Sequence, residues 1–354
     1  MGNFDTLKLS VEAATGGKNT VLLDDMGMPG IYVVIPKFKL SDVIDGAPQD
    51  THPAFIVDGE EKDSIFVSKY QNIVMNDRAY SLPMKDPKTY VNFDQAETYC
   101  RNKGRGFHLM TNAEWAAIAL WCKKNNTMPR GNNNYGQDHA YAHEKGVVTY
   151  VYESGGKKYN GRVATGSGPA TWSHDWTNEG IFDMNGNVWE WTAGLRLNEG
   201  EIQIIPNNNA ATGIVHSPTS SLWKAIMPDG TFVEPGTDGT LKIDGETATP
   251  SGIRINTTVV NKTTDSTSLS KTLQTVSAAS GVSIPMVLKA LGIYPIDADL
   301  GGDNFYARNN GERLPFRGGS FYDGASAGVF ALNMRNTRAY SSFVVGFRSA
   351  FVSL

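Results

Sequence analysis

Asn187 and Glu190 carry side-chain oxygens close together in this sequence and could bind a metal ion. Asn187 and Glu190 flank Val188 in the run Asn187-Val188-Trp189-Glu190. A carboxylate beside an amide oxygen and a backbone carbonyl is the set of hard ligands that Ca²⁺ prefers. The pattern makes Asn187, Val188 and Glu190 candidate ligands of a structural Ca²⁺, with hydrogen bonds from both side chains to the adjacent turn as the alternative.

A second candidate metal site is the histidine pair His139 and His143, with Glu144 beside it. Two histidines four residues apart share one face of a helix and could ligate Zn²⁺ there. The preceding run of residues 132–136 is rich in Asn and ends in Gly, which is typical of a loop. A pair of surface histidines is the interpretation that this context favours.

The two cysteines, Cys100 and Cys122, are assigned to the core instead of to chemistry. Each falls on the apolar stripe of a predicted helix, at helical spacing from Phe93 and Trp115 respectively. Free cysteine behaves as a small buried hydrophobe in such positions. Two cysteines in 354 residues also exclude a disulfide framework.

Two helices and several short strands must position these side chains. A helix is predicted over residues 92–100, and a second begins at Thr111, where Glu114 three residues later completes a capping box. Short β-branched and aromatic runs at 31–36 and 64–68 predict strands. Residues 188–192 alternate as a strand with both tryptophans on one side and Glu190 on the other.

The distribution of residue types indicates a compact centre and an insertion. All seven tryptophans lie between Trp115 and Trp223, so a core is expected there. Between residues 247 and 280 the chain is rich in Ser and Thr and has no aromatic residue, which favours exposed strands and turns. We therefore expect an insertion at about 196–305, with a short helix over residues 284–291.

Composition excludes several classes of protein. The 32 basic and 36 acidic residues give a net charge of −4 with no basic run, which argues against nucleic acid as a partner. No apolar stretch is long enough for a membrane span, and the first residues show no signal peptide. The sequence is predicted to be a soluble protein that is rich in loops.

Four ordered motifs resemble the formylglycine-generating-enzyme, or sulfatase-modifying factor, family, which has a C-type-lectin-related fold. The main one is the run from Phe182 to Thr192. The others are residues 109–115, Arg317-Gly318-Gly319-Ser320-Phe321 and Gly346-Phe347-Arg348. The resemblance covers roughly residues 65 to 195 and 305 to 354. It implies an α+β chain with a C-type lectin fold of the formylglycine-generating-enzyme type.

The enzymatic part of this resemblance is missing. The family's oxidases use two cysteines near the carboxyl terminus, in the region that here runs from Arg317 to Arg348. This chain has no cysteine after Cys122. Without a thiolate there is neither a soft copper ligand nor a sulfur nucleophile at that place, so we expect no enzymatic activity and no required cofactor.

The carboxyl-terminal segment resembles the variable region of proteins that diversity-generating retroelements mutate, among them phage tropism determinants. Residues 320–344 combine aromatic residues, small polar residues and arginines, as antibody paratopes do. Two motifs of the resemblance bracket a variable segment at about 317–348. The residues that it implies as varied and ligand-binding are Ser320, Phe321, Tyr322, Asp323, Ser326, Met334, Arg335, Thr337, Tyr340, Ser341, Ser342, Phe343 and Val344.

The combined prediction is a non-enzymatic receptor-binding protein of a phage tail. A β-rich region over residues 1–62 would attach to virion tail components or mediate oligomerisation, and residues 63–354 would form the lectin-type domain. The resemblance implies a homo-oligomer, with a trimer as its model, that binds a host-surface receptor, whether protein or glycan. The alternatives are a family member with a metal-dependent activity at the histidine pair and a fixed Ca²⁺-dependent bacterial lectin.

Overall fold

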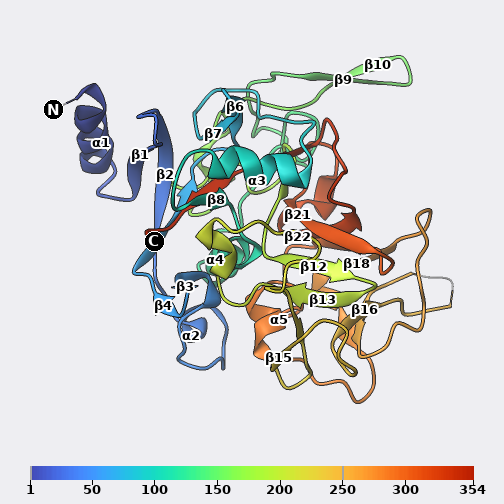
Figure 1. Cartoon of the computed structure of the whole chain (residues 1–354). Coiled ribbons are helices and arrows are strands. Elements are labelled where there is room, and N and C mark those ends of the chain that lie inside the picture. The colour runs from blue at the N-terminus through green and yellow to red at the C-terminus, as the bar shows by residue number, and fades with distance from the viewer. Residues whose placement is uncertain (1, 249–250) are drawn as a thin grey trace.

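A computed structural model describes residues 2–248 and 251–354; Met1 and the insertion residues Thr249 and Pro250 lie outside the described residues. Within these ranges, five α-helices accompany two large β-sheets (Figure 1). The helices are α1 (Asn3–Ala14), α2 (Leu40–Val43), α3 (Phe93–Arg101), α4 (Asn112–Lys124) and α5 (Met286–Ala290). Short 3₁₀ turns span Pro53–Phe55, Ala170–Trp172, Asn209–Thr212, Leu273–Thr275 and Gly324–Ser326.

The two long helices of the centre begin where the sequence predicts. The Asn92 side chain accepts a hydrogen bond from the Gln95 N–H at 2.9 Å and caps α3. At α4, Thr111 accepts from the Glu114 N–H at 3.1 Å, while the Glu114 carboxylate accepts from the Thr111 N–H at 2.9 Å. This reciprocal pair satisfies two free backbone donors, so the predicted capping box is confirmed.

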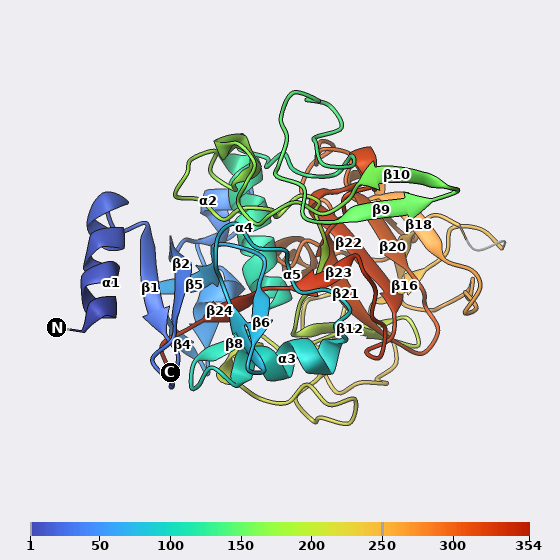
Figure 2. The ribbon, with the colours of Figure 1, turned by 90° about the horizontal axis from the view of Figure 1, so that it is seen from above.

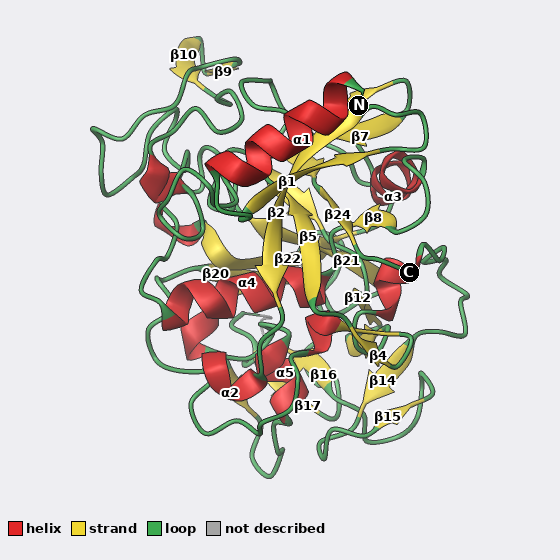
Figure 3. Cartoon of the chain, turned by 90° about the vertical axis from the view of Figure 1, so that its left-hand side faces the viewer, coloured by secondary structure: helices red, strands yellow, loops and turns green. Residues whose placement is uncertain are grey.

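One sheet joins the two ends of the chain (Figure 3). Its order is β1-β2-β5-β24-β8, so β24 from the carboxyl terminus lies between β5 and β8. Its strands are β1 (Asn19–Leu23), β2 (Pro29–Pro36), β5 (Ser64–Ser68), β24 (Ser349–Phe351) and β8 (Phe107–Leu109). The last strand of the chain is thus built into this sheet, with a neighbour on either side.

The second sheet carries the family motifs and the insertion. Its main path runs β18-β20-β22-β21-β12-β13-β16-β17-β19, and β11 pairs with both β21 and β23. The strands of this path are β18 (Leu269–Thr272), β20 (Asn304–Ala307), β22 (Gly328–Asn336), β21 (Glu312–Gly318), β12 (Leu195–Asn198), β13 (Glu201–Ile204), β16 (Lys242–Asp244), β17 (Arg254–Asn256) and β19 (Ser277–Ala278). Off it lie β11 (Trp189–Trp191), β23 (Val345–Phe347), β14 (Lys224–Ile226) and β15 (Phe232–Val233).

Three two-stranded hairpins complete the described fold: β3 (Ile56–Val57) with β4 (Glu60–Glu61), β6 (Ile73–Met75) with β7 (Arg78–Tyr80), and β9 (Val151–Ser154) with β10 (Lys157–Asn160). The β9–β10 hairpin extends from the body next to the carboxyl-terminal strands (Figure 2). None of the helices in the described part of the chain is long and apolar enough to cross a membrane.

The predicted insertion is packed into the core instead of lying on its surface. Ile253, Ile255, Leu269 and Leu273 are buried, and they belong to the same hydrophobic cluster as Trp115 of α4. Composition favoured exposed strands and turns for residues 247–280. Because these apolar side chains point inward, the stretch extends the sheet, while most of its Ser and Thr residues are exposed or half-exposed and Thr263 is buried against Asn309.

The amino-terminal region differs from the predicted β-rich lead-in in two ways. It opens with α1, whose first turn is closed by a hydrogen bond from the Gly2 N–H to the Asp5 carboxylate at 2.9 Å. In addition, β2 pairs along its length with β5, across the predicted boundary at residue 62. The described part of the predicted lead-in therefore shares a sheet and a core with the rest of the chain, through β1, β2 and residues 33–55.

Candidate ligand-binding face

Two buried arginines anchor the ends of the variable segment (residues 317–348). Arg317 on β21 donates to the Asn112 side chain at 2.9 and 2.7 Å and to the Leu291 carbonyl at 3.0 Å. Burial lowers the pKa of Arg317 to about 9, so the guanidinium stays charged at neutral pH. Because a buried charge must keep its partners, Arg317 fixes this end of the segment to α4.

Arg348 anchors the other end through Glu190 of β11. Its guanidinium donates two hydrogen bonds of 2.6 Å to the two carboxylate oxygens, and both residues are fully buried. The Gln71 amide donates to the same carboxylate at 3.0 Å and accepts from the Asn187 amide at 2.8 Å. Asn187 also accepts from the Val163 N–H at 2.8 Å, so both its amide oxygen and its amide nitrogen have protein partners.

This arrangement does not fit the predicted Ca²⁺ at Asn187, Val188 and Glu190. The Arg348 guanidinium occupies the side of the Glu190 carboxylate where a cation would bind, and Asn187 points to backbone and amide partners. A divalent cation would have to displace a bidentate ion pair between buried groups. Among the described residues, hydrogen bonds from both side chains to the adjacent turn do not form either, because Glu190 pairs with Arg348 and Gln71, and Asn187 pairs with Gln71, Asn132 and Val163.

The predicted histidine pair is not a preorganised site either. His139 and His143 lie in an irregular loop and both are exposed. His139 is held by Asn133, whose side-chain oxygen accepts from its backbone N–H at 2.7 Å. Residues 2–248 and 251–354 contain no cluster of three His, Cys, Asp or Glu side chains able to hold a metal ion.

Gly318 and Gly319 set up the tight turn that begins the predicted binding residues. Both have positive φ, and a Cβ at Gly319 would lie 2.3 Å from the Ala327 side chain. The following turn is closed by the Asp323 carboxylate, which accepts from the backbone and hydroxyl of Ser320, each at 2.7 Å. Burial raises the pKa of Asp323, although these hydrogen bonds oppose the shift.

The structure separates the predicted ligand-binding residues into two groups. Exposed or half-exposed are Tyr322, Asp323, Ser326, Arg335, Thr337, Tyr340, Ser341, Ser342 and Phe343. Buried are Ser320, Phe321, Met334 and Val344. Their side chains face the core in this structure, because each lies on the inward side of a strand or turn whose neighbour faces outward, as Met334 does beside Arg335.

Tyr322 is the centre of the exposed group, with 38% of its surface accessible. Its ring lies 6.4 Å from that of Phe343, between centroids, and 6.0 Å from that of Tyr152. Burial and the neighbouring Asp323 carboxylate, followed by the Tyr340 hydroxyl, raise the pKa of Tyr322 to about 12. We call Tyr322, Asp323, Arg335, Tyr340 and Phe343 the binding face. No hydrogen bond joins Ser326, Thr337, Ser341 or Ser342 to Tyr322 among the described residues.

The β9–β10 hairpin supplies aromatic rings that the sequence analysis missed. Tyr152 stacks on Phe343 with centroids 5.5 Å apart and planes 12° apart, and its hairpin partner Tyr159 lies 5.1 Å from Tyr135. The signal was the pair Gly155-Gly156, which is typical of a two-residue hairpin turn and has positive φ at both positions. The hairpin extends the binding face beyond the variable segment.

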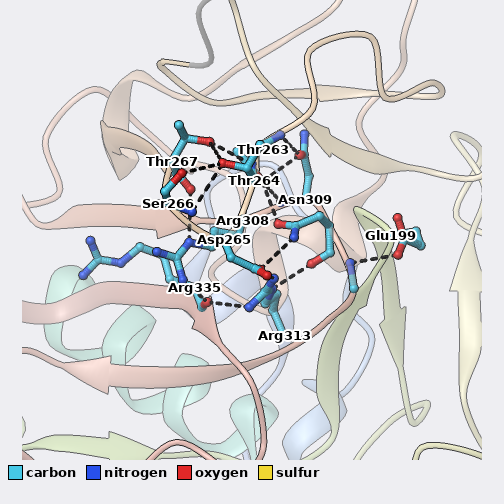
Figure 4. A network of polar contacts seen from close by, with 12 residues as sticks. Glu199, Thr263, Thr264, Asp265, Ser266, Thr267, Arg308, Asn309, Arg313 and Arg335 are labelled. Carbon is cyan, nitrogen blue, oxygen red and sulfur yellow. Dashed lines mark hydrogen bonds and ion pairs between the residues drawn. The ribbon is translucent and has the colours of Figure 1, made fainter.

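A polar network from the insertion supports the opposite edge of the face (Figure 4). Arg335 lies over the Tyr306 ring, with its guanidinium carbon 4.5 Å from the centroid. Its backbone carbonyl accepts from Arg313 at 3.2 Å, and Arg313 pairs with Asp265 of the insertion at 2.8 Å. The insertion thereby holds the end of β22, where Arg335 emerges.

Both cysteines are remote from this chemistry. Cys100 and Cys122 are fully buried on α3 and α4, and burial raises the pKa of each thiol. Neither offers a thiolate at neutral pH.

Comparison with known proteins agrees with this architecture. The family model described as Sulfatase-modifying factor enzyme 1-like domain matches residues 54–216, which include α3, α4 and β11. These residues are similar to that domain. The chain has the C-type lectin-like fold of the formylglycine-generating type, as its motifs predict. In this fold β11, within the matched residues, pairs with β21 and β23 and so joins the variable segment to the matched region.

Solved structures similar to this chain include PvdO from Pseudomonas aeruginosa, with 13% sequence identity over 94% of this chain and 97% of that chain and a TM-score of 0.36. Treponema denticola variable protein 1 shares 11% identity over 94% and 98% of the two chains, with a TM-score of 0.34. The Major Tropism Determinant P3c variant shares 9% over 94% and 70%, with a TM-score of 0.31. No curated protein sequence matches the chain.

Proposed function

We propose that this chain is a non-enzymatic ligand-binding protein whose binding face is built on the variable segment, and that it serves as a receptor-binding protein of a phage tail. The observation that carries the proposal is the contrast between the ends of the segment and its middle. Arg317 and Arg348 are buried and fixed by several hydrogen bonds, whereas Tyr322, Arg335 and Tyr340 between them reach the surface.

This contrast is what a protein with changeable binding residues requires. Side chains on a rigid scaffold can be exchanged without loss of the fold, as in the binding loops of other scaffolds. Tyrosine and arginine offer large contact area and adaptable hydrogen bonds at low cost in side-chain entropy. The residues proposed to vary are therefore the exposed ones, and the partner would be a protein or glycan receptor on the host surface.

The non-enzymatic part rests on the cysteines. The family's oxidases place two cysteines in the region between Arg317 and Arg348, and this chain has none beyond Cys122. The side chains of the binding face are those of a recognition surface, with aromatic rings, hydroxyls, one guanidinium and the Asp323 carboxylate, which is hydrogen-bonded to Ser320. In this proposal no cofactor is required.

The proposal also assigns the amino-terminal region to attachment. Among the described helices and strands, the main packing partner of helix α1 is the edge strand β1. The helix exposes the apolar side chains of Phe4, Leu7 and Leu9. Such a projecting element suits contact with virion tail components or with other copies in a homo-oligomer, a trimer by resemblance. Several copies on one tail would combine modest single-site affinities into avidity.

Sequencing the same locus in related genomes tests the proposal. We expect substitutions to concentrate at the exposed positions between 320 and 344, and a near-copy of that stretch to lie close to a reverse-transcriptase gene. Substitutions spread evenly over the chain, or the absence of the near-copy, would contradict diversification. Binding to glycans that disappears with a chelator would instead favour a fixed Ca²⁺-dependent lectin, and stoichiometric redox metal in the purified protein would favour an enzyme.

A further inference from the structure

A cavity of about 500 Å³ lies away from the variable segment, between β2, α4 and the loop over residues 174–179. Its walls are mostly apolar, with Val33 and Ile35 on β2 and Ile118 and Trp121 on α4. Figure 3 shows the strand and the helix from the side on which α1 also lies. The volume is within the range of pockets that bind small molecules.

One polar group is fixed in the wall of this cavity. His174 is only 6% exposed, and its Nδ1 accepts a hydrogen bond from the Ile181 N–H at 2.9 Å. An imidazole whose Nδ1 accepts carries its proton on Nε2. That N–H has no hydrogen-bond partner among the described residues, and the ring packs against Trp121 with centroids 5.3 Å apart.

The charged side chains that line the cavity are those of Lys18, Asp175 and Glu179. Lys18 lies 3.8 Å from Asp175, whose carboxylate also accepts from Ser173 and Thr177. Deeper inside, burial lowers the pKa of His174 to about 4, so the imidazole is neutral at physiological pH. A charged ligand group would therefore find no counter-charge at the inner wall, and burying it there would be costly.

We propose that this cavity is a second binding site, for a small uncharged molecule with an aromatic or branched apolar body and one carbonyl or hydroxyl oxygen. The body would pack between β2 and Trp121, and the oxygen would accept the free hydrogen bond of His174 Nε2. An unpartnered buried N–H is unfavourable, so a ligand that pairs it gains affinity. None of the lining residues belongs to the variable segment, so this site is independent of the binding face.

The test uses Prodan, an uncharged naphthyl ketone whose fluorescence shifts to the blue in apolar surroundings, titrated into the full-length protein. We expect a saturable blue shift with one site per chain. Ile35 lies in the β2 wall and belongs to the same hydrophobic cluster as Ile118 of α4, so Ile35→Trp should fill the cavity and abolish binding. His174→Phe keeps an aromatic ring but removes the donor, and it should weaken binding about tenfold, the worth of one hydrogen bond.

Tyr322→Ser is the matched control, because it alters the aromatic binding face and leaves the cavity intact. It should bind Prodan as the unchanged protein does, and circular dichroism melts should show that each variant is folded. Should Ile35→Trp not fold, Ile118→Phe fills the cavity from the α4 side. The proposal fails if the protein gives no saturable shift, if folded filling variants and His174→Phe all bind normally, or if Tyr322→Ser removes the signal.

Discussion

Glu190 shows how one residue of a family signature can be misread from its sequence neighbours. The carboxylate was a candidate Ca²⁺ ligand because Asn187 and a backbone carbonyl lie next to it in the chain. Its partner is Arg348, 158 residues away, with both hydrogen bonds at 2.6 Å. Hydropathy and spacing describe near neighbours, so the long-range ion pair that neutralises Glu190 could not be derived from them.

We predict that Glu190→Gln destabilises the fold by about 3–5 kcal/mol, because it leaves the Arg348 guanidinium buried without its counter-charge. Urea unfolding followed by tryptophan fluorescence measures this loss. Glu199→Gln is the control: Glu199 pairs with Lys262 on the surface, and its loss should change stability by less than about 0.5 kcal/mol. Added Ca²⁺ or EDTA should leave the melting temperature unchanged; stabilisation by Ca²⁺ that Glu190→Gln abolishes would restore the calcium hypothesis.

Phe321 and Tyr322 are neighbours that should respond in opposite ways to truncation. Phe321 is fully buried, so Phe321→Ala should cost about 3–5 kcal/mol of stability. Tyr322 is exposed on the other side of the chain, so Tyr322→Ala should cost less than about 1 kcal/mol while weakening ligand binding. Thermal melts of the two variants make the comparison. Equal destabilisation would mean that the two side chains are not divided between core and surface as described.

The buried carboxyl group of Asp303 should make the stability of the fold depend on pH. It is buried beside Gly328 and accepts the Phe330 N–H at 2.7 Å, and burial raises its pKa to about 8. The native chain therefore keeps a proton that the unfolded chain, with a pKa of about 3.9, releases. Stability from this group is present at low pH and is lost as pH rises toward about 8.

Asp303→Asn should flatten this dependence, since an amide stays neutral and its oxygen can still accept the Phe330 N–H. Urea unfolding at pH 6.5 and pH 8 measures the change in stability. Both pH values lie above the range in which Asp183 titrates, because burial raises the pKa of Asp183 only to about 6. We expect the unchanged protein to lose stability between these pH values and the variant to lose less. Parallel losses in both proteins would assign the pH dependence to other groups.

At the scale of elements, the sequence predicts best where a local rule acts. The caps at Asn92 and Thr111 and the apolar spacing behind them fix α3 and α4 within a residue or two. The β9–β10 hairpin has both faces near solvent and thus no alternation of apolar and polar residues, so only its glycine pair signals it. Helix α1 is likewise exposed on most sides, and its position depends on β1.

The hairpin is held to the body by ring contacts with the variable segment, chiefly Tyr152 on Phe343. We therefore predict that Phe343→Ser speeds amide hydrogen exchange across residues 151–160 at least severalfold and leaves exchange in α4 unchanged. Thr337→Ala, at an exposed position remote from these rings, is the matched control. If exchange in the hairpin is unaffected, substitutions in the segment do not reshape the neighbouring aromatic surface.

At the scale of the whole molecule, the variable segment lies between framework strands on both sides. Strand β21 leads into it, β23 forms its last residues and β24 follows it, so exposed residues in the middle can change while both ends stay paired. Composition and motifs predicted the fold type, but not that the insertion and the amino terminus would join the two sheets. Such joining depends on strand pairs far apart in sequence, for which a single chain gives no local signal.

The position of β24 leads to the last prediction. It pairs with β5 on one side and β8 on the other, and Ala350 is buried between them. Removing residues 349–354 would leave β8 without a partner and β5 paired on one side only, which detaches β8 from the five-stranded sheet, so we expect no cooperative thermal transition by circular dichroism. Removing residues 2–14 takes away only α1, which packs mainly on the edge strand β1, and should keep the transition within a few degrees. If instead the carboxyl-terminal truncation melts cooperatively near the full-length temperature, the variable segment is not clamped by the sheet that follows it, and a freely exchangeable binding face would need a different explanation.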